Sequence, residues 1–222
     1  MRLLTYTYKG RTAIGVVKDD WVIDASAAAA LMQFPAPPAT MRELIEAGDT
    51  AVGQVRTATN SAAVKLKTDS SGLEAAGAAI RLADVRIEAP VRPSKIIGIG
   101  LNYAKHALEG GRPIPEQPLI FSKWPTTVIA PGDYIDYPTK ITQQLDFEAE
   151  LAVVMGKQAK NVAAAEALSY VFGYTVGNDV SARDLQRNDG QWGRAKGLDT
   201  FCPLGPCIVT ADEIPNPQDL PI

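Results

Sequence analysis

The stretch DFEAELAVVMGK, residues 146–157, decides the fold class of this chain. It is the most strand-like segment of the sequence, because apolar residues dominate it up to Gly156. Glu148 and Glu150 lie two residues apart, and side chains at that spacing on a strand point to the same face. Two carboxylates in so apolar a segment cost free energy unless positive charge compensates them. The face is therefore either the solvated side of an edge strand or part of a site for a divalent cation.

A cation at this face needs a further oxygen ligand, and Asp179 is the candidate. It ends the apolar run YVFGYTVGND, residues 170–179, where a strand meets a polar loop, although the same residues also suit a plain turn. Three carboxylates with no histidine or cysteine beside them select a hard ion, Mg²⁺ first and Mn²⁺ second.

Three carboxylates around a divalent ion leave about one negative charge, so an anionic substrate needs fixed cations as well. The candidates near these segments are Lys123, Arg183 and Lys196. Each of them, taken singly, is equally consistent with an ordinary surface charge.

The segment NYAKHALEGG, residues 102–111, contains His106, the only histidine of the chain. A solitary histidine is often structural or simply solvated, but Glu109 follows three residues later, and that spacing places both on one face of a helix. A carboxylate beside an imidazole fixes its tautomer and strengthens it as a base. With Gly110 and Gly111 directly after it, the segment predicts a short helix that closes over a site as a lid.

The composition is that of an ordinary globular protein, with 222 residues, 46% hydrophobic and 21% charged. The net charge of −3 gives no reason to expect nucleic acid or an acidic membrane as partner. No apolar run suits a signal peptide or a membrane span, so we expect a cytoplasmic protein. Cys202 and Cys207 are expected to be reduced, structural thiols, because a zinc site would lack further ligands.

Short strands extend outward from the central segment. Residues 2–24 predict strands that turn at Lys9 and at Asp19, and short helices follow, one of them capped by Thr40. The stretch RIEAPVRPSK, residues 86–95, predicts a linker. Many short strands with few helices indicate a mainly β architecture preceded by a small N-terminal module.

The second half of the chain continues this pattern. KIIGIGL, residues 95–101, predicts a buried strand, and RNDGQWGRAKG, residues 187–197, predicts a glycine-rich polar loop. The run GIGLNY begins like a dinucleotide-binding fingerprint but carries Tyr103 where the fingerprint needs glycine, so it predicts no dinucleotide site.

Several segments together resemble the fumarylacetoacetate hydrolase family. In chain order they are KIIGIGLNYAKHALE (95–109), DFEAELAVVMGK (146–157), GYTVGNDVSARDLQ (173–186) and GQWGRAKGLDTFCPLGP (190–206). GRTAIGVV and DDWVIDA, near the N-terminus, resemble the small variable domain that precedes the catalytic domain in bacterial members. The resemblance implies a small α+β N-terminal domain with a linker (1–88) and a family-like catalytic domain (89–222). That catalytic domain is expected to be a mixed β-sandwich roll, mainly β with some α, in a homodimer.

The resemblance also implies roles for individual residues. The Mg²⁺ or Mn²⁺ ligands are Glu148, Glu150 and Asp179. The catalytic residues are His106, Glu109 and Lys196, with the His–Glu dyad activating water and the lysine stabilising developing negative charge. Near the substrate pocket lie Arg183 and Gln186, and Lys123 is kept as a substrate-binding cation on its place in the sequence.

Family substrates are small 2-oxo or 1,3-dioxo acids. We expect a metal-dependent hydrolase of the acylpyruvate or fumarylpyruvate type, which cleaves a carbon–carbon bond with dyad-activated water. An isomerase or decarboxylase of 2-oxo-hept-3-ene-1,7-dioate type compounds is the alternative that keeps the same site. A non-catalytic member that binds metal or ligand is the alternative of another class.

One departure from the family pattern concerns the C-terminal part. Family catalytic domains continue with further strands and a Thr-Gly-Thr-Pro loop that reaches the active site, whereas this sequence stops after PNPQDLPI and contains no such motif. We therefore expect the natural protein to be longer and the C-terminal part of the catalytic domain to be missing here. Such an absence would expose sheet edges and remove part of the substrate pocket.

Overall fold

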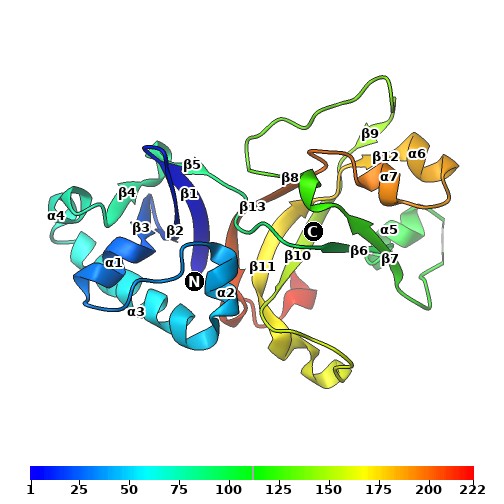
Figure 1. Cartoon of the computed structure of the whole chain (residues 1–222). Coiled ribbons are helices and arrows are strands. Elements are labelled where there is room, and N and C mark those ends of the chain that lie inside the picture. The colour runs from blue at the N-terminus through cyan, green and yellow to red at the C-terminus, as the bar shows by residue number, and fades with distance from the viewer. Residues whose placement is uncertain (112) are drawn as a thin grey trace.

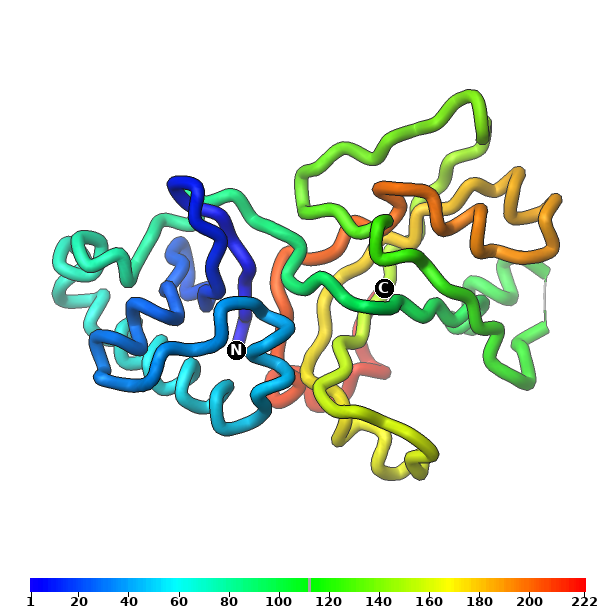
Figure 2. The backbone as a smooth tube through the Cα atoms, viewed as in Figure 1, coloured from blue at the N-terminus to red at the C-terminus, as the bar shows by residue number. Residues whose placement is uncertain are grey.

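A single strand near the C-terminus joins the two parts of the molecule. In the computed structural model, which describes residues 1–111 and 113–222, β13 (Cys202–Thr210) pairs antiparallel with β1 (Arg2–Tyr8) on one side. On its other side it pairs antiparallel with β11 (Val171–Asn178). Figures 1 and 2 show this strand running between an N-terminal part rich in helices and a C-terminal part built mainly of strands.

The other elements are short apart from one helix. The remaining strands are β2 (Arg11–Lys18), β3 (Trp21–Asp24), β4 (Ala79–Arg81), β5 (Arg86–Ile87), β6 (Ile96–Gly100), β7 (Leu119–Lys123), β8 (Val128–Ile129), β9 (Leu145–Asp146), β10 (Ala149–Met155) and β12 (Ser181–Ala182). The α-helices are α1 (Ala25–Leu31), α2 (Met41–Glu46), α3 (Gly48–Leu66), α4 (Ser70–Ala75), α5 (Ala104–Glu109), α6 (Arg183–Asn188) and α7 (Gly193–Lys196). The 3₁₀ helices are η1 (Leu82–Asp84), η2 (Pro125–Thr127), η3 (Ala164–Tyr170), η4 (Ala211–Glu213) and η5 (Pro217–Asp219).

The main sheet has nine strands and crosses both parts. Its path is β10-β11-β13-β1-β2-β3-β4, with β5 beside β1 and β8 beside β13. Two small antiparallel pairs, β6 with β7 and β9 with β12, lie outside it. The predicted mainly β architecture with some helix is confirmed. The boundary between 1–88 and 89–222 stays a prediction, because the sheet is continuous across the two parts.

The N-terminal part follows the expected pattern of hairpins and helices. The predicted turns hold, with Lys9 at φ 48° and Asp19 at φ 50°, which are left-handed conformations typical of tight turns. Thr40 caps α2 in a capping box with Glu43. The helices α1 and α3 pack on the strands (Figure 1), and Ile208 of β13 lies in the same core as Leu3.

Two predictions for the C-terminal part are wrong. The segment 95–101 forms the strand β6, but Ile97 is 59% exposed, because β6 pairs only with β7 and is covered on one face. The segment 187–197 is not a plain loop. It contains the end of α6 and the short helix α7, because Ala195 packs with Phe201 in an apolar core.

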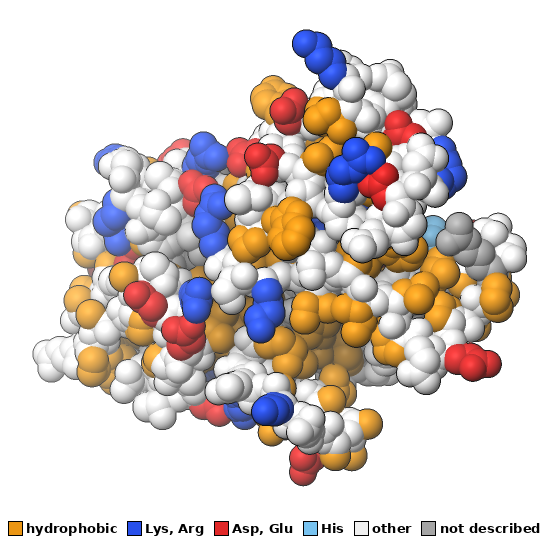
Figure 3. Space-filling model, turned by 45° about the vertical axis from the view of Figure 1, so that its right-hand side comes forward, with side chains coloured by type: hydrophobic (Ala, Val, Ile, Leu, Met, Phe, Trp, Pro, Cys, Tyr) orange, Lys and Arg blue, Asp and Glu red, His pale blue; other side chains and the backbone are white. Residues whose placement is uncertain are grey.

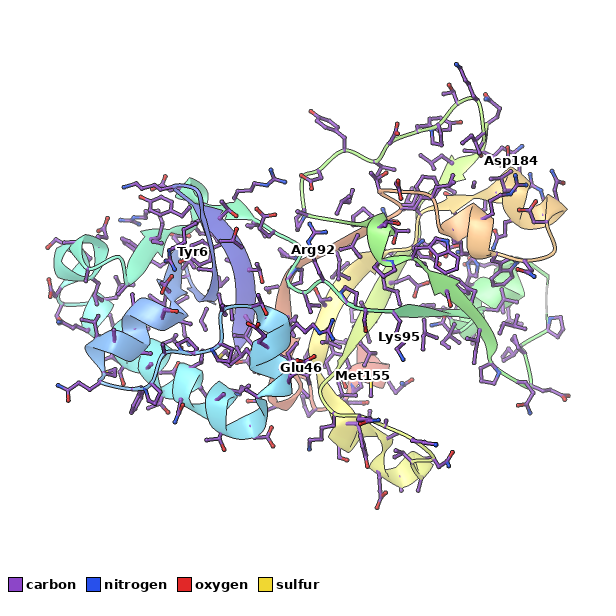
Figure 4. All side chains as sticks on the ribbon, viewed as in Figure 1. Tyr6, Glu46, Arg92, Lys95, Met155 and Asp184 are labelled. Atoms are coloured by element: carbon purple, nitrogen blue, oxygen red, sulfur yellow. The ribbon has the colours of Figure 1, made fainter. Side chains whose placement is uncertain are left out.

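Exposed apolar side chains gather on the C-terminal part, where Figure 3 shows an apolar patch. They stand on β6, β7, β10 and β11 and include Ile97, Ile120, Val153, Met155 and Val176. Figure 4 labels Met155 at the end of β10. Among the described residues, no helix combines the length and the apolar character that crossing a membrane requires. Cys202 and Cys207 are free thiols, as predicted.

A buried polar network fixes the N-terminal sheet to its first helix. Asp24 is fully buried and accepts hydrogen bonds from the Tyr6 hydroxyl and from Arg11 Nη2, each at 2.5 Å. Its other oxygen accepts from the amide of Ala27 at 2.7 Å and so caps α1. Burial and the hydrogen bond to Asp24 raise the pKa of Tyr6, whose side chain is labelled in Figure 4.

The substitution Tyr6→Phe tests this network. It should lower the free energy of unfolding by about 1.5–3 kcal/mol, because a hydrogen bond to a buried charged group is lost while the ring remains. Urea denaturation of the full chain measures this quantity, with Tyr8→Phe on the same strand as the matched control. Equal losses for the two variants would show that the buried hydroxyl contributes nothing.

Candidate active site

The pairing of β10 with β11 brings the acidic residues together. Glu150 stands opposite Gly177, the amide of Asp179 donates to the carbonyl oxygen of Glu148 at 2.9 Å, and the amide of Glu148 donates to Asn178 Oδ1 at 3.1 Å. Glu148 lies just before β10, because the predicted strand divides into β9 and β10. Glu148 and Glu150 are half-buried and Asp179 is buried, so they do not form a solvated outer face.

Lys196 places a buried positive charge among these carboxylates. It is 2% exposed, and its Nζ atom donates to Glu148 Oε2 at 3.0 Å, Asp179 Oδ2 at 2.6 Å and Ser181 Oγ at 2.8 Å. The Phe121 ring lies 5.0 Å from the same atom and covers it from another side. A buried ammonium group is tolerated only with such partners, so Lys196 and the carboxylates depend on one another.

Lys123 holds the same aspartate from the opposite side. It is 4% exposed, and its Nζ atom donates to Asp179 Oδ1 at 2.6 Å. It also donates to the carbonyl oxygens of Lys196 at 2.6 Å and Val180 at 3.3 Å. Burial lowers the pKa of Lys123, and the charge of Asp179 opposes that shift. These contacts let Lys123 hold Asp179 in position, and its predicted contact with a substrate stays a prediction.

Arg183 and Gln186 lie together on α6 beside the carboxylates. The guanidinium group contacts Glu148 at 2.5 Å and Asp146 at 2.9 Å, and its Nη1 atom donates to Gln186 Oε1 at 2.9 Å. Burial lowers the pKa of Arg183, but the two carboxylates outweigh it and the net shift is upward. The structure therefore brings both residues to the acidic cluster, and their contact with a substrate stays a prediction.

The surroundings of Glu150 disfavour its ionised form. Burial first, then the charges of Asp179 and Glu148, raises the pKa of Glu150 to about 7. The Tyr103 side chain and the Lys196 charge act in the opposite direction. The three carboxylates thus lie close enough to repel one another, and added positive charge would stabilise the ionised form of Glu150.

The chemistry of the donor set fits a hard divalent cation, because it consists of carboxylate oxygens with no soft ligand. As the side chains lie, no three His, Cys, Asp or Glu residues within 1–111 and 113–222 are grouped as ligands of one ion. The Lys196 ammonium group contacts both Glu148 and Asp179. The structure brings the three predicted ligands together, and their assignment to a metal stays a prediction.

The predicted lid is the helix α5. His106 and Glu109 lie one turn apart on it, and both are exposed. The helix ends at Gly110, and Gly111 follows with φ 64°, a left-handed conformation that glycine adopts without strain. The short helix is therefore confirmed, while the pairing of the two side chains as a dyad stays a prediction.

Two packed aromatic rings, which the sequence did not indicate, lie on one side of Lys196. Phe121 and Trp192 pack edge to face with 5.5 Å between their ring centroids. A Cβ atom at Gly98 would lie 2.2 Å from the Phe121 ring, and one at Gly100 would lie 2.2 Å from the Trp192 ring. The glycines of GIGLNY are therefore packing glycines, in keeping with the prediction that they bind no dinucleotide.

The sequence also did not predict two polar residues of the site, Ser181 and Tyr103. Ser181 accepts from Lys196 and itself donates to the carbonyl oxygen of Asp179 at 2.9 Å. Tyr103 accepts from the amide of Leu151 at 3.1 Å. Their position in the sequence could have indicated them, since each lies within a few residues of a predicted site residue.

Comparison with known proteins gives the family. The sequence profile described as "Fumarylacetoacetate (FAA) hydrolase C-terminal" matches residues 95–222, which is more than half of the chain. The chain belongs to the fumarylacetoacetate hydrolase family, as the motifs predict. It spans about half the length of the curated relatives it matches, 55% of one and 46% of another.

Relatives of this chain include both isomerising and hydrolytic enzymes. The chain is 41% identical over 191 residues to the mitochondrial oxaloacetate tautomerase fahd2 of Xenopus laevis, a match that covers 85% of this chain. A 2-hydroxyhepta-2,4-diene-1,7-dioate isomerase of Mycobacterium marinum has a TM-score of 0.64 and 31% identity, over 95% of this chain and 66% of that one. A maleylpyruvate hydrolase of Sphingobium sp. SYK-6, solved with manganese(II) and pyruvate, has a TM-score of 0.65 and 31% identity, over 98% and 70% of the two chains.

The substitution Lys123→Met tests the proposed positioning role. It should lower the free energy of unfolding by about 3–5 kcal/mol, because one partner of a buried ion pair is removed and buried acceptors are left unpaired. Urea denaturation measures the loss, and Lys157→Met at an exposed position is the matched control. A change no larger than that of the control would contradict the role given to Lys123.

Proposed function

We propose that this protein is a divalent-metal-dependent hydrolase of small 1,3-dioxo acids of the acylpyruvate or fumarylpyruvate type. The observation that carries the proposal is the group of Glu148, Glu150 and Asp179, in which Lys123 and Lys196 both hold Asp179 and Lys196 also holds Glu148. Membership of a family that includes a hydrolase solved with manganese(II) and pyruvate supports the same assignment.

The carboxylates Glu148, Glu150 and Asp179 would hold the cation. When bound there, a divalent ion supplies a Lewis acid that binds neighbouring oxygens of an oxo acid and favours negative charge on them. Lys196 acts through its fixed positive charge, which offsets the carboxylates and makes the site tolerable for an anionic substrate. Arg183, with Gln186 beside it, adds a second fixed cation at the same end of the sheet.

The helix α5 would supply the base. His106, oriented by Glu109, accepts a proton from water, and the water oxygen forms a bond to the distal carbonyl carbon. The bond between that carbon and the methylene group then breaks, and the electron pair stays on the pyruvate part as its enolate. A proton taken up at the methylene carbon completes pyruvate, and the distal part leaves as a carboxylic acid.

Isomerisation is the second candidate function. Among the described residues, the groups packed against the carboxylates are lysines, an arginine and a tyrosine, while His106 is exposed on α5. Such an arrangement can move a proton between carbon and oxygen without water attack. The similarity to an oxaloacetate tautomerase also favours this candidate, because a tautomerase moves a proton without cleaving a carbon–carbon bond.

An assay with two substrates separates the candidates. With Mn²⁺ and acetylpyruvate the full chain should release pyruvate, and His106→Ala should lower the rate about 10²- to 10⁴-fold, because a general base is lost. Lys105→Ala, on the same helix, is the control and should keep the activity. With oxaloacetate, loss of the enol absorbance without pyruvate release identifies the tautomerase. No turnover of either substrate together with bound Mn²⁺ would indicate a non-catalytic member.

Cation binding can be measured without turnover. Mn²⁺ at about 100 times its dissociation constant should raise the free energy of unfolding by about 2.7 kcal/mol, since it binds only the folded site. Glu150→Gln should remove most of this gain, because one ligand loses its charge. Glu166→Gln, at an exposed position in η3, is the matched control. A wild-type chain that gains nothing from Mn²⁺ or Mg²⁺ would overturn the metal assignment.

A further inference from the structure

Tyr103 connects the helix that carries His106 to the strand that carries Glu150. It is the N-cap residue of α5, so its backbone is continuous with the helix. Its hydroxyl oxygen accepts a hydrogen bond from the amide of Leu151 at 3.1 Å. Leu151 directly follows Glu150 on β10. This contact is therefore a direct hydrogen bond between the start of the predicted lid and the acidic strand.

The Tyr103 side chain also interacts with the Glu150 side chain. A phenol oxygen that accepts from a backbone amide still has its own proton to donate. The hydroxyl therefore contacts the strand β10 at two neighbouring residues, Glu150 and Leu151.

The backbone on either side of α5 makes this anchor important. Leu101 before the helix has φ 52° and Gly111 after it has φ 64°, so the chain turns sharply at both ends. The entry side is fixed at Gly100, which packs against the Trp192 ring. Ala107 is fully buried and carries no polar group that could set the direction of the helix. The Tyr103 hydroxyl supplies a directional contact at the beginning of α5.

We propose that Tyr103 is a positioning residue that holds the Glu150–Leu151 segment of β10 and the start of α5 in fixed relation to each other. The inference rests on the proposed function, because it makes Tyr103 the connection between the predicted metal ligands and the predicted base. Residues that orient a ligand without binding the metal themselves typically change metal affinity about 10- to 100-fold when they are altered.

Tyr103→Phe in the full chain tests the proposal, because it removes the hydroxyl and keeps the ring. Calorimetry should show Mn²⁺ binding weakened about 10-fold or more. The kcat for acetylpyruvate should fall by a similar factor with KM nearly unchanged, since the reacting groups and not the substrate contacts are displaced. Hydrogen exchange of residues 104–109 should become faster. Tyr134→Phe, where the side chain is 94% exposed, is the matched control and should change none of these.

A measurement on the unaltered protein completes the test. In the wild type the Leu151 amide should exchange slowly, because the Tyr103 hydroxyl is its hydrogen-bond partner. It should exchange faster in Tyr103→Phe. If Tyr103→Phe binds Mn²⁺ and turns over substrate like the wild type, the inference is overturned while the proposed function stands. If the wild type neither binds Mn²⁺ nor turns over substrate, the proposed function fails, and only the exchange measurements then decide the anchoring role.

Discussion

The two oxygens of Asp179 each bind a different buried ammonium group, and the rest of the site depends on this arrangement. Lys123 holds Oδ1 and Lys196 holds Oδ2, both at 2.6 Å. Removing either partner would leave a buried charged group without its counter-charge, which is strongly destabilising. Because Lys123 also binds the carbonyl oxygen of Lys196, the strand β7, the end of β11 and the helix α7 are joined at one point. Glu148 and Glu150 add two further carboxylates around this centre, and Lys196 also contacts Glu148.

The sheet explains why residues far apart in the sequence meet there. The β10–β11 pair sets the register of the acidic residues, and β13 supports that pair from its other side. The same strand β13 also pairs with β1, so the N-terminal part is a structural base joined to the site through one continuous sheet. The polar network around Asp24 stabilises that base from within. Stability of the N-terminal part and geometry of the acidic cluster are thus physically linked.

Local patterns in the sequence predicted the elements well, and charge chemistry predicted the members of the cluster. The turn residues Lys9 and Asp19, the cap at Thr40 and the strand around Glu150 follow from short-range rules. What could not be predicted depends on packing between distant segments. The exposure of Ile97 reflects how few strands cover β6, and the helix α7 forms because Ala195 is buried against Phe201.

The same limit applies to the site. The sequence indicated Lys123 only as a cation near the site, and its three hydrogen bonds can be seen only when β7, β11 and α7 are brought together. The pairing of β13 with β1 on one side and with β11 on the other limits how its length can change. One added or deleted residue within it would turn the side chains of one half to the wrong face while the other half kept its pairing. A change in the length of this strand would therefore disturb pairing on which both parts of the sheet depend, whereas a change in the length of a connection would leave that pairing intact.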